Sequence, residues 1–255
     1  MMKTIPSSIV LLAAMLLMPI SQAADKEPGV LLKSGEWGQA MGSYGVPKQF
    51  EHLVPAKWPK DRWYSLVIKE NDLLVEAQSP NDKNPEWLKK IVSQIPEKNA
   101  PEARSSLALV EQEADDILHL RVPDAPIKEG KHPLYVFKNG GHSLNPELEY
   151  QYRLKLNDVA FGMRVQNGLK GKNGAPYGEG ATYFIEYDGK QFEYALGYYG
   201  WASRIIGITD MDGDGFPDFI IEIDGSNSIG KIILLSSTAK PGKNSATAIL
   251  HSWGC

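Results

Sequence analysis

The stretch RIIGITDMDGDGFPDFIIEI, residues 204–223, places an acidic loop between two runs of β-branched apolar residues. Such runs are typical of buried strands, because Ile favours the extended backbone of a sheet. The loop itself, residues 210–218, carries four aspartates at alternating positions together with two glycines. We therefore expect two buried strands joined by a turn in which like charges are crowded together.

A calcium ion would make this crowding tolerable. Calcium takes about six to eight oxygen ligands and prefers carboxylates and backbone carbonyls. Aspartates at alternating positions of a tightly curled loop direct their oxygens to one centre, and Gly215 permits the sharp turn. The predicted ligands are Asp210, Asp212, Asp214, Asp218 and the backbone carbonyl of Phe216.

The loop begins like an EF-hand but does not continue as one. An EF-hand has a bidentate Glu at its twelfth position, where this chain has Ile221, and Glu222 comes one residue late. Apolar strands, not helices, flank the loop. The motif D-x-D-x-D-G-x-x-D between two strands, residues 205–224, resembles the calcium loop of FG-GAP and VCBS type repeats. That resemblance implies the same ligands, but the motif occurs once, so a full propeller is not expected.

The alternative is a solvated acidic turn without a bound ion. Two carboxylates about 5 Å apart repel by roughly 3 kcal/mol at an effective dielectric constant near 20, and the loop contains several such pairs. A solvated turn relieves this repulsion by spreading its side chains, but the strands on both sides fix its ends. We expect calcium as a structural clip and not as a catalytic metal, because the ligands leave little room for a substrate.

The N-terminus predicts export. Residues 1–23 combine Lys3, an apolar run too short to span a bilayer, and small residues before a cleavage position after Ala23, as in a signal peptide. The single cysteine, Cys255, is the last residue, and it is either a free thiol, a link to another chain or without a role. We expect a periplasmic or secreted protein without a membrane span.

The rest of the chain predicts a mainly β protein built from antiparallel sheets and hairpins. Residues 24–105 form a mixed region, with two short strands in 62–78 and one helix near 84–95. Residues 106–255 form a β-rich region that carries the calcium loop. Within it, Asp188-Gly189 predicts a tight turn between two aromatic strands.

Alternation of apolar and polar residues predicts strands with one face in the core and one in water, as at residues 118–122. On this basis His119 is expected to be solvated. The five histidines show no metal-binding spacing. They are His52, His119, His132, His142 and His251.

Two further stretches have compositions found in binding sites. The glycine-rich stretch 167–180 lacks the spacing of a phosphate-binding loop and is expected to be a surface loop. The stretch FEYALGYYGW, residues 192–201, contains five aromatic residues. It is either part of the sheet core or an exposed face that stacks on sugars or peptides.

Function is less constrained by the sequence than the fold. The formal net charge of −4, without clustered Lys and Arg, argues against nucleic acid as a partner. We expect an exported calcium-binding protein with a non-catalytic binding or envelope-interaction role, whose protein or glycan ligand is unknown. The alternative is a secreted hydrolase of glycans or peptides with a structural calcium ion, which would show a deep pocket and strongly shifted carboxylates.

Overall fold

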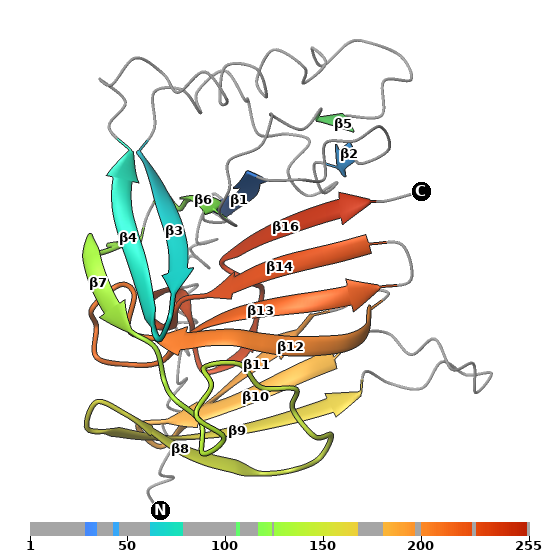
Figure 1. Cartoon of the computed structure of the whole chain (residues 1–255). Helices are drawn as coiled ribbons and strands as arrows, with labels where there is room; N and C mark the ends of the chain where they lie inside the picture. Colours follow the sequence, from blue (N-terminus) through green and yellow to red (C-terminus); the bar gives the residue numbers. More distant parts are fainter. Residues whose placement is uncertain are drawn as a thin grey trace, which may run out of the picture.

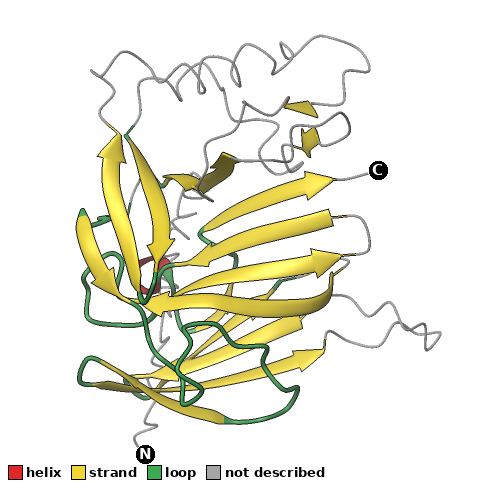
Figure 2. Cartoon of the chain, viewed as in Figure 1, coloured by secondary structure: helices red, strands yellow, loops and turns green. Residues whose placement is uncertain are grey.

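The computed structural model describes residues 29–34, 43–45, 62–78, 106–107, 117–123, 125–167, 181–196, 200–225 and 228–253. Within these ranges the chain is almost entirely strand, and the single helical segment is a short 3-10 turn, η3 (Ser236–Thr238) (Figure 2). The predicted mainly β class is therefore confirmed. The predicted helix near 84–95 and the predicted signal peptide, residues 1–23, lie outside the described residues.

Eleven strands form a large sheet in the order β12-β13-β14-β16-β1-β6-β3-β4-β7, with β2 paired to β16 and β5 paired to β2. All neighbours are antiparallel except β1 and β16, which are parallel. The strands are β1 (Gly29–Ser34), β2 (Ser43–Gly45), β3 (Trp63–Lys69), β4 (Asp72–Gln78), β5 (Ser106–Leu107), β6 (Ile117–Arg121), β7 (Gly130–Pro133), β12 (Gly200–Thr209), β13 (Asp218–Gly225), β14 (Ser228–Leu234) and β16 (Ala248–Trp253).

A smaller sheet of five strands lies against β12–β14 (Figure 1). Its order is β15-β11-β10-β9-β8, and only the β11–β15 pair is parallel. The strands are β8 (Tyr152–Leu156), β9 (Val159–Asn167), β10 (Ala181–Tyr187), β11 (Lys190–Ala195) and β15 (Gly242–Asn244).

Strand β13 separates two hydrophobic cores. Phe219 and Ile221 point into the core shared with the small sheet, together with buried aromatic residues such as Tyr183. Ile220 points to the opposite face, into a core that includes Leu73 of β4. Because successive side chains of a strand point to opposite faces, a run of apolar residues such as FIIEI is buried on both sides.

A β-bulge in β12 redirects the chain just before the acidic loop. Ile205 pairs with Ile221 and Gly207 pairs with Ile220, so Ile206 is an extra residue in the ladder. The bulge lets both Ile205 and Ile208 face the small sheet, while Ile206 packs against the other core. Regular alternation would put residues three apart on opposite faces.

The hairpins expected from turn residues are present. Strands β3 and β4 are joined at residues 70–71, and β10 and β11 are joined by the tight turn at Asp188-Gly189. In the aromatic stretch that follows, Phe192 and Tyr194 are buried in the core. Tyr198 and Tyr199, like most of the glycine-rich stretch 167–180, lie outside the described residues.

The expectation for His119 was wrong. His119 is only 3% exposed and Arg121 only 2% exposed, although both were expected on a solvated face. Strand β6 lies inside the large sheet between β1 and β3, and all its central side chains are buried. Alternation identifies the more apolar face of a strand, but it does not show whether the other face is covered.

None of the described residues belongs to an apolar helix of membrane-spanning length.

Candidate metal centre

The acidic loop connects β12 to β13 at one end of the large sheet, where Thr209 and Asp218 are partners in the ladder. Two glycines in the loop have left-handed backbone, Gly213 with φ 72° and Gly215 with φ 90°. L-residues with a side chain rarely adopt such angles, so glycine lets the chain reverse twice within a few residues. The loop is therefore short, tightly curled and fixed at both ends.

Three of the four predicted carboxylates converge in this loop. Asp210, Asp212 and Asp218 each contribute an oxygen, and these oxygens all lie within 4.8 Å of one another. Asp218 is fully buried, Asp212 is 2% exposed and Asp210 is partly buried. The structure thus provides a buried group of three aspartates that is able to hold a metal ion.

The other two predicted ligands have different surroundings. The carboxylate of Asp214 accepts a hydrogen bond from the backbone N–H of Phe216, at 2.8 Å. Both of its carboxylate oxygens also lie 2.9 Å from Ser236 Oγ. The Phe216 ring stacks on Tyr187 of the small sheet, with ring centroids 4.8 Å apart. The role of the Phe216 carbonyl as a ligand stays a prediction.

Asp218 organises the loop through backbone donors. Its Oδ2 accepts hydrogen bonds from the N–H groups of Met211, at 2.6 Å, and Asp212, at 3.2 Å. Its Oδ1 accepts a hydrogen bond from the N–H of Ser236, at 2.8 Å. A carboxylate that satisfies several backbone N–H groups holds the turn in one conformation.

Two serines that the sequence analysis did not identify complete the cluster. Ser236 Oγ lies 2.9 Å from oxygens of both Asp214 and Asp218, but a hydroxyl has one proton to donate. Ser237 donates from Oγ and, at 3.3 Å, from its N–H to Asp212 Oδ2. Both residues begin the 3-10 turn after β14. In the β13–β14 ladder Phe219 pairs with Leu234, so the chain that continues beyond β14 lies next to Asp218.

Lys128 and His132 support the loop from β7 and the segment before it. Lys128 Nζ donates to the carbonyl of Gly213, at 2.9 Å. The ring nitrogens of His132 lie 2.9 Å from the carbonyl oxygen of Asp210 and 2.8 Å from that of Lys128. Both partners are acceptors, so a neutral ring satisfies one of them and a protonated ring satisfies both. No sequence signal links these residues to a loop that lies about eighty positions later.

Burial and crowding disfavour ionised carboxylates in this cluster. Burial raises the pKa of Asp218 well above its usual value, and the neighbouring Asp212 adds to this effect. Burial also raises the pKa of Asp212, where the hydrogen bond from Ser237 acts in the opposite direction and the charge of Asp214 in the same direction. A divalent cation at the centre would reverse this balance and favour the charged forms.

Among the described residues the Lys128 ammonium lies at the loop, where it donates to the Gly213 carbonyl, but it is not paired with a loop carboxylate. Within this part of the chain, no lysine or arginine forms an ion pair with any of the four aspartates. In addition, Asp210 Oδ1 is buried and has no hydrogen-bond partner among the described residues. A buried carboxylate oxygen without a donor is costly unless a cation satisfies it. The donor set therefore fits a hard divalent cation.

Comparison of the chain with protein-family models, with curated protein sequences and with solved structures found no match. The likeness of the loop to FG-GAP and VCBS type repeats therefore stays a prediction from its motif.

Proposed function

We propose that this chain is an exported, non-catalytic binding protein whose acidic loop holds a calcium ion as a structural clip. The observation that carries the proposal is the buried oxygen of Asp210, which has no hydrogen-bond donor among the described residues and belongs to a cluster whose carboxylates form no ion pair with a described lysine or arginine. The export assignment rests on the signal-like residues 1–23.

The choice of calcium follows from the ligand atoms. Every group that converges in the loop is an oxygen, as a hard cation prefers, and no histidine or cysteine side chain belongs to the described cluster. Magnesium demands a smaller octahedral site and usually keeps several waters, whereas calcium accepts many oxygen ligands in irregular geometry. A single tight curl of aspartates supplies the second kind of site.

The surroundings of the ligands favour a structural role. Asp218 is fully buried and accepts several hydrogen bonds, so it does not face a substrate. Among the described residues, the two carboxyl groups with raised pKa, Asp212 and Asp218, both belong to this loop. Strongly shifted carboxylates are a mark of hydrolase sites, but here burial and the neighbouring aspartates of the proposed ion site account for the raised pKa values, which favours a binding protein over the alternative of a secreted hydrolase.

Thermal unfolding of chelator-treated protein, with and without metal, tests this proposal. Single extracellular calcium sites have dissociation constants of about 0.1 to 1 mM, and tenfold saturation then stabilises the fold by about 1.4 kcal/mol. For a chain of this size the melting temperature should rise by about 3–6 °C in calcium, and by much less in equimolar magnesium. Identical melting curves in chelator and in 10 mM calcium, an order of magnitude above those constants, would contradict the proposal.

A further inference from the structure

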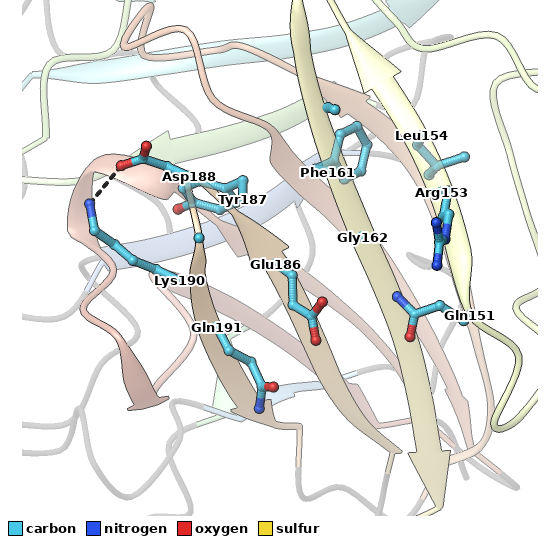
Figure 3. A pocket seen from close by; sticks show the side chains of 12 residues that line it. Gln151, Arg153, Leu154, Phe161, Gly162, Glu186, Tyr187, Asp188, Lys190 and Gln191 are labelled. Atoms are coloured by element: carbon cyan, nitrogen blue, oxygen red, sulfur yellow. Dashed lines mark hydrogen bonds and ion pairs between the residues drawn. The ribbon is translucent and has the colours of Figure 1, made fainter.

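The outer face of the small sheet contains a hollow of about 790 Å³, on the side away from the core that it shares with the large sheet (Figure 3). It lies over β8–β11 and extends to the turn between β10 and β11. Pockets of this size accommodate small organic ligands. The hollow does not include any of the loop aspartates, so it is a separate site.

A glycine creates the hollow. Arg153, Gly162, Glu186 and Gln191 form one row across four neighbouring strands, because each is the ladder partner of the next. Side chains on this row point outward, and Gly162 leaves a gap one strand wide in its middle. A Cβ atom placed on Gly162 would lie 2.9 Å from Gln151 Nε2, so Gln151 reaches over the glycine.

The polar groups around the gap are available for a ligand. Gln151, Arg153, Glu186 and Gln191 are all exposed, and none of the four side chains makes a hydrogen bond or ion pair with another residue that the structure describes. Figure 3 shows Glu186 of β10 and Gln151, which comes just before β8, extending toward β9 from its two sides. By contrast, Asp188 and Lys190 at the end of the hollow are paired with each other, at 2.7 Å.

We propose that this hollow binds a neutral oligosaccharide. Sugar hydroxyls both donate and accept hydrogen bonds, and they are matched by planar groups of both kinds: a guanidinium, a carboxylate and two amides. The charges of the hollow balance, since its lining contains two cations, Arg153 and Lys190, and two carboxylates, Glu186 and Asp188. Leu154 and Phe161 also border the hollow, but their side chains belong to the core on the other side of the sheet, so the groups offered to a ligand are polar.

Other classes of ligand fit the hollow less well. A peptide that extends a sheet pairs with an exposed edge strand, but this site is on a sheet face where the backbone of β9 is already paired on both sides. Nucleic acids and other polyanions require clustered cations, and the carboxylate of Glu186 in the middle of the row opposes them. The inference gives a ligand class to the binding role proposed above, but it depends on the hollow and not on the ion.

Three variants test the proposal. Glu186→Gln removes a hydrogen-bonding charge from the hollow. Glu193→Gln makes the same change outside the hollow, two residues along β11 from Gln191, the ladder partner of Glu186. Gly162→Val fills the gap. Its backbone is in the ordinary strand region and its nearest obstacle is the flexible end of Gln151, so a β-branched residue should be accepted without loss of stability.

The probe is an array of neutral oligosaccharides of two to six sugars, with sialylated and sulfated glycans on the same array, followed by calorimetry with the best neutral binder. The wild-type chain and Glu193→Gln should bind equally, whereas Glu186→Gln should lose about tenfold or more in affinity. Gly162→Val should lose binding while its melting temperature is kept.

Three outcomes would overturn the proposal: no neutral glycan bound, binding of anionic glycans alone, or equal binding by all three variants. The measurement is made in calcium and again in chelator. Glycan binding without any calcium effect on melting would contradict the proposed clip and leave the hollow assignment standing, and the converse result would do the opposite.

Discussion

At the scale of single residues, Asp218 and Asp210 have different roles in the acidic loop. Both oxygens of Asp218 accept hydrogen bonds from backbone N–H groups, so this side chain maintains the curl whether or not an ion is bound. Asp210 accepts one hydrogen bond, from the N–H of Gly215 at 3.2 Å, and its other oxygen is buried without a described donor. Removing the charge of Asp210 should therefore affect the ion more than the fold.

We predict that Asp210→Asn abolishes the calcium-dependent rise in melting temperature. In chelator the variant should be at least as stable as the wild-type chain, because one of three crowded like charges is lost while the size of the side chain is kept. Paired thermal melts in chelator and in calcium measure both effects. Asp158→Asn, at a fully exposed aspartate outside the loop, is the control and should keep the rise. A full calcium response in Asp210→Asn would remove that residue from the ligand set.

A second prediction concerns His119. Burial lowers the pKa of this histidine from 6.5 to about 4. Between these two values the unfolded chain binds a proton that the folded chain does not, so stability falls as the pH is lowered through this window. The expected loss between pH 7 and pH 5 is about 2 kcal/mol from this site.

Urea unfolding of the wild-type chain and of His119→Gln at the two pH values measures this loss. The difference between pH 7 and pH 5 should be smaller in the variant by about that amount, whatever its overall stability. An equal difference in both proteins would mean that folding does not lower the pKa of His119. In the wild-type chain the His119 ring Nδ1 lies 3.2 Å from Gln78 Oε1. The glutamine introduced by His119→Gln has an amide N–H that is able to donate to the same oxygen.

The site shows how far single-residue reasoning from sequence extends. The four aspartates could be predicted from the sequence, because aspartates at alternating positions of a tight loop bring several oxygen ligands to one centre. Ser236, Lys128 and His132 were not identified, since they reach the loop only after β14 and the segment around β7 are placed beside it. That placement depends on strand order, which no local pattern encodes.

At the scale of elements, local turn chemistry predicted the hairpins, and long-range packing decided the rest. The turn at Asp188-Gly189 and the two runs around the acidic loop were correct because each signal lies within the element it forms. The bulge at Ile206 was not predicted, because it depends on how the side chains of β12 pack into the two cores on either side of the sheet. The burial of His119 was missed for a similar reason, because β6 is an interior strand of the large sheet.

The two glycines of the loop allow an element-scale prediction. Gly215→Ala introduces a Cβ that meets nothing within 4 Å, so its cost is backbone strain alone, about 1–2 kcal/mol at φ 90°. Gly213→Ala carries a similar strain, but its Cβ would lie 1.9 Å from Lys128 Nζ. That lysine must move and lose its hydrogen bond to the Gly213 carbonyl.

Chemical denaturation of the two variants should therefore show Gly213→Ala as the less stable by about 1 kcal/mol. In a Lys128→Ala background the difference between the two glycine variants should disappear, because the obstacle is gone. A difference that persists in that background would show that Lys128 is not its source.

At the scale of the whole molecule, the acidic loop touches both sheets. It is continuous with β12 and β13 of the large sheet, and it reaches the small sheet through Phe216. The Phe216 ring stacks on Tyr187, and Tyr187 stacks in turn on Phe192, with ring centroids 4.4 Å apart. The pKa of the Tyr187 hydroxyl is raised by burial first and then by nearby charges that include the loop aspartates. The turn that follows Tyr187 lines one end of the hollow.

We predict that calcium in the loop reduces the motion of the β10–β11 hairpin through this stack. Hydrogen exchange should slow on addition of calcium in β12 and β13 and also at residues 185–192. In Phe216→Ala the backbone carbonyl is kept, so the ion still binds and protects β12 and β13, but the protection of residues 185–192 should be lost. Tyr187→Phe preserves the stacked ring and should behave like the wild-type chain. If calcium protects the hairpin equally in Phe216→Ala, the two sheets respond to the ion through the shared core around Phe219 and not through the aromatic stack.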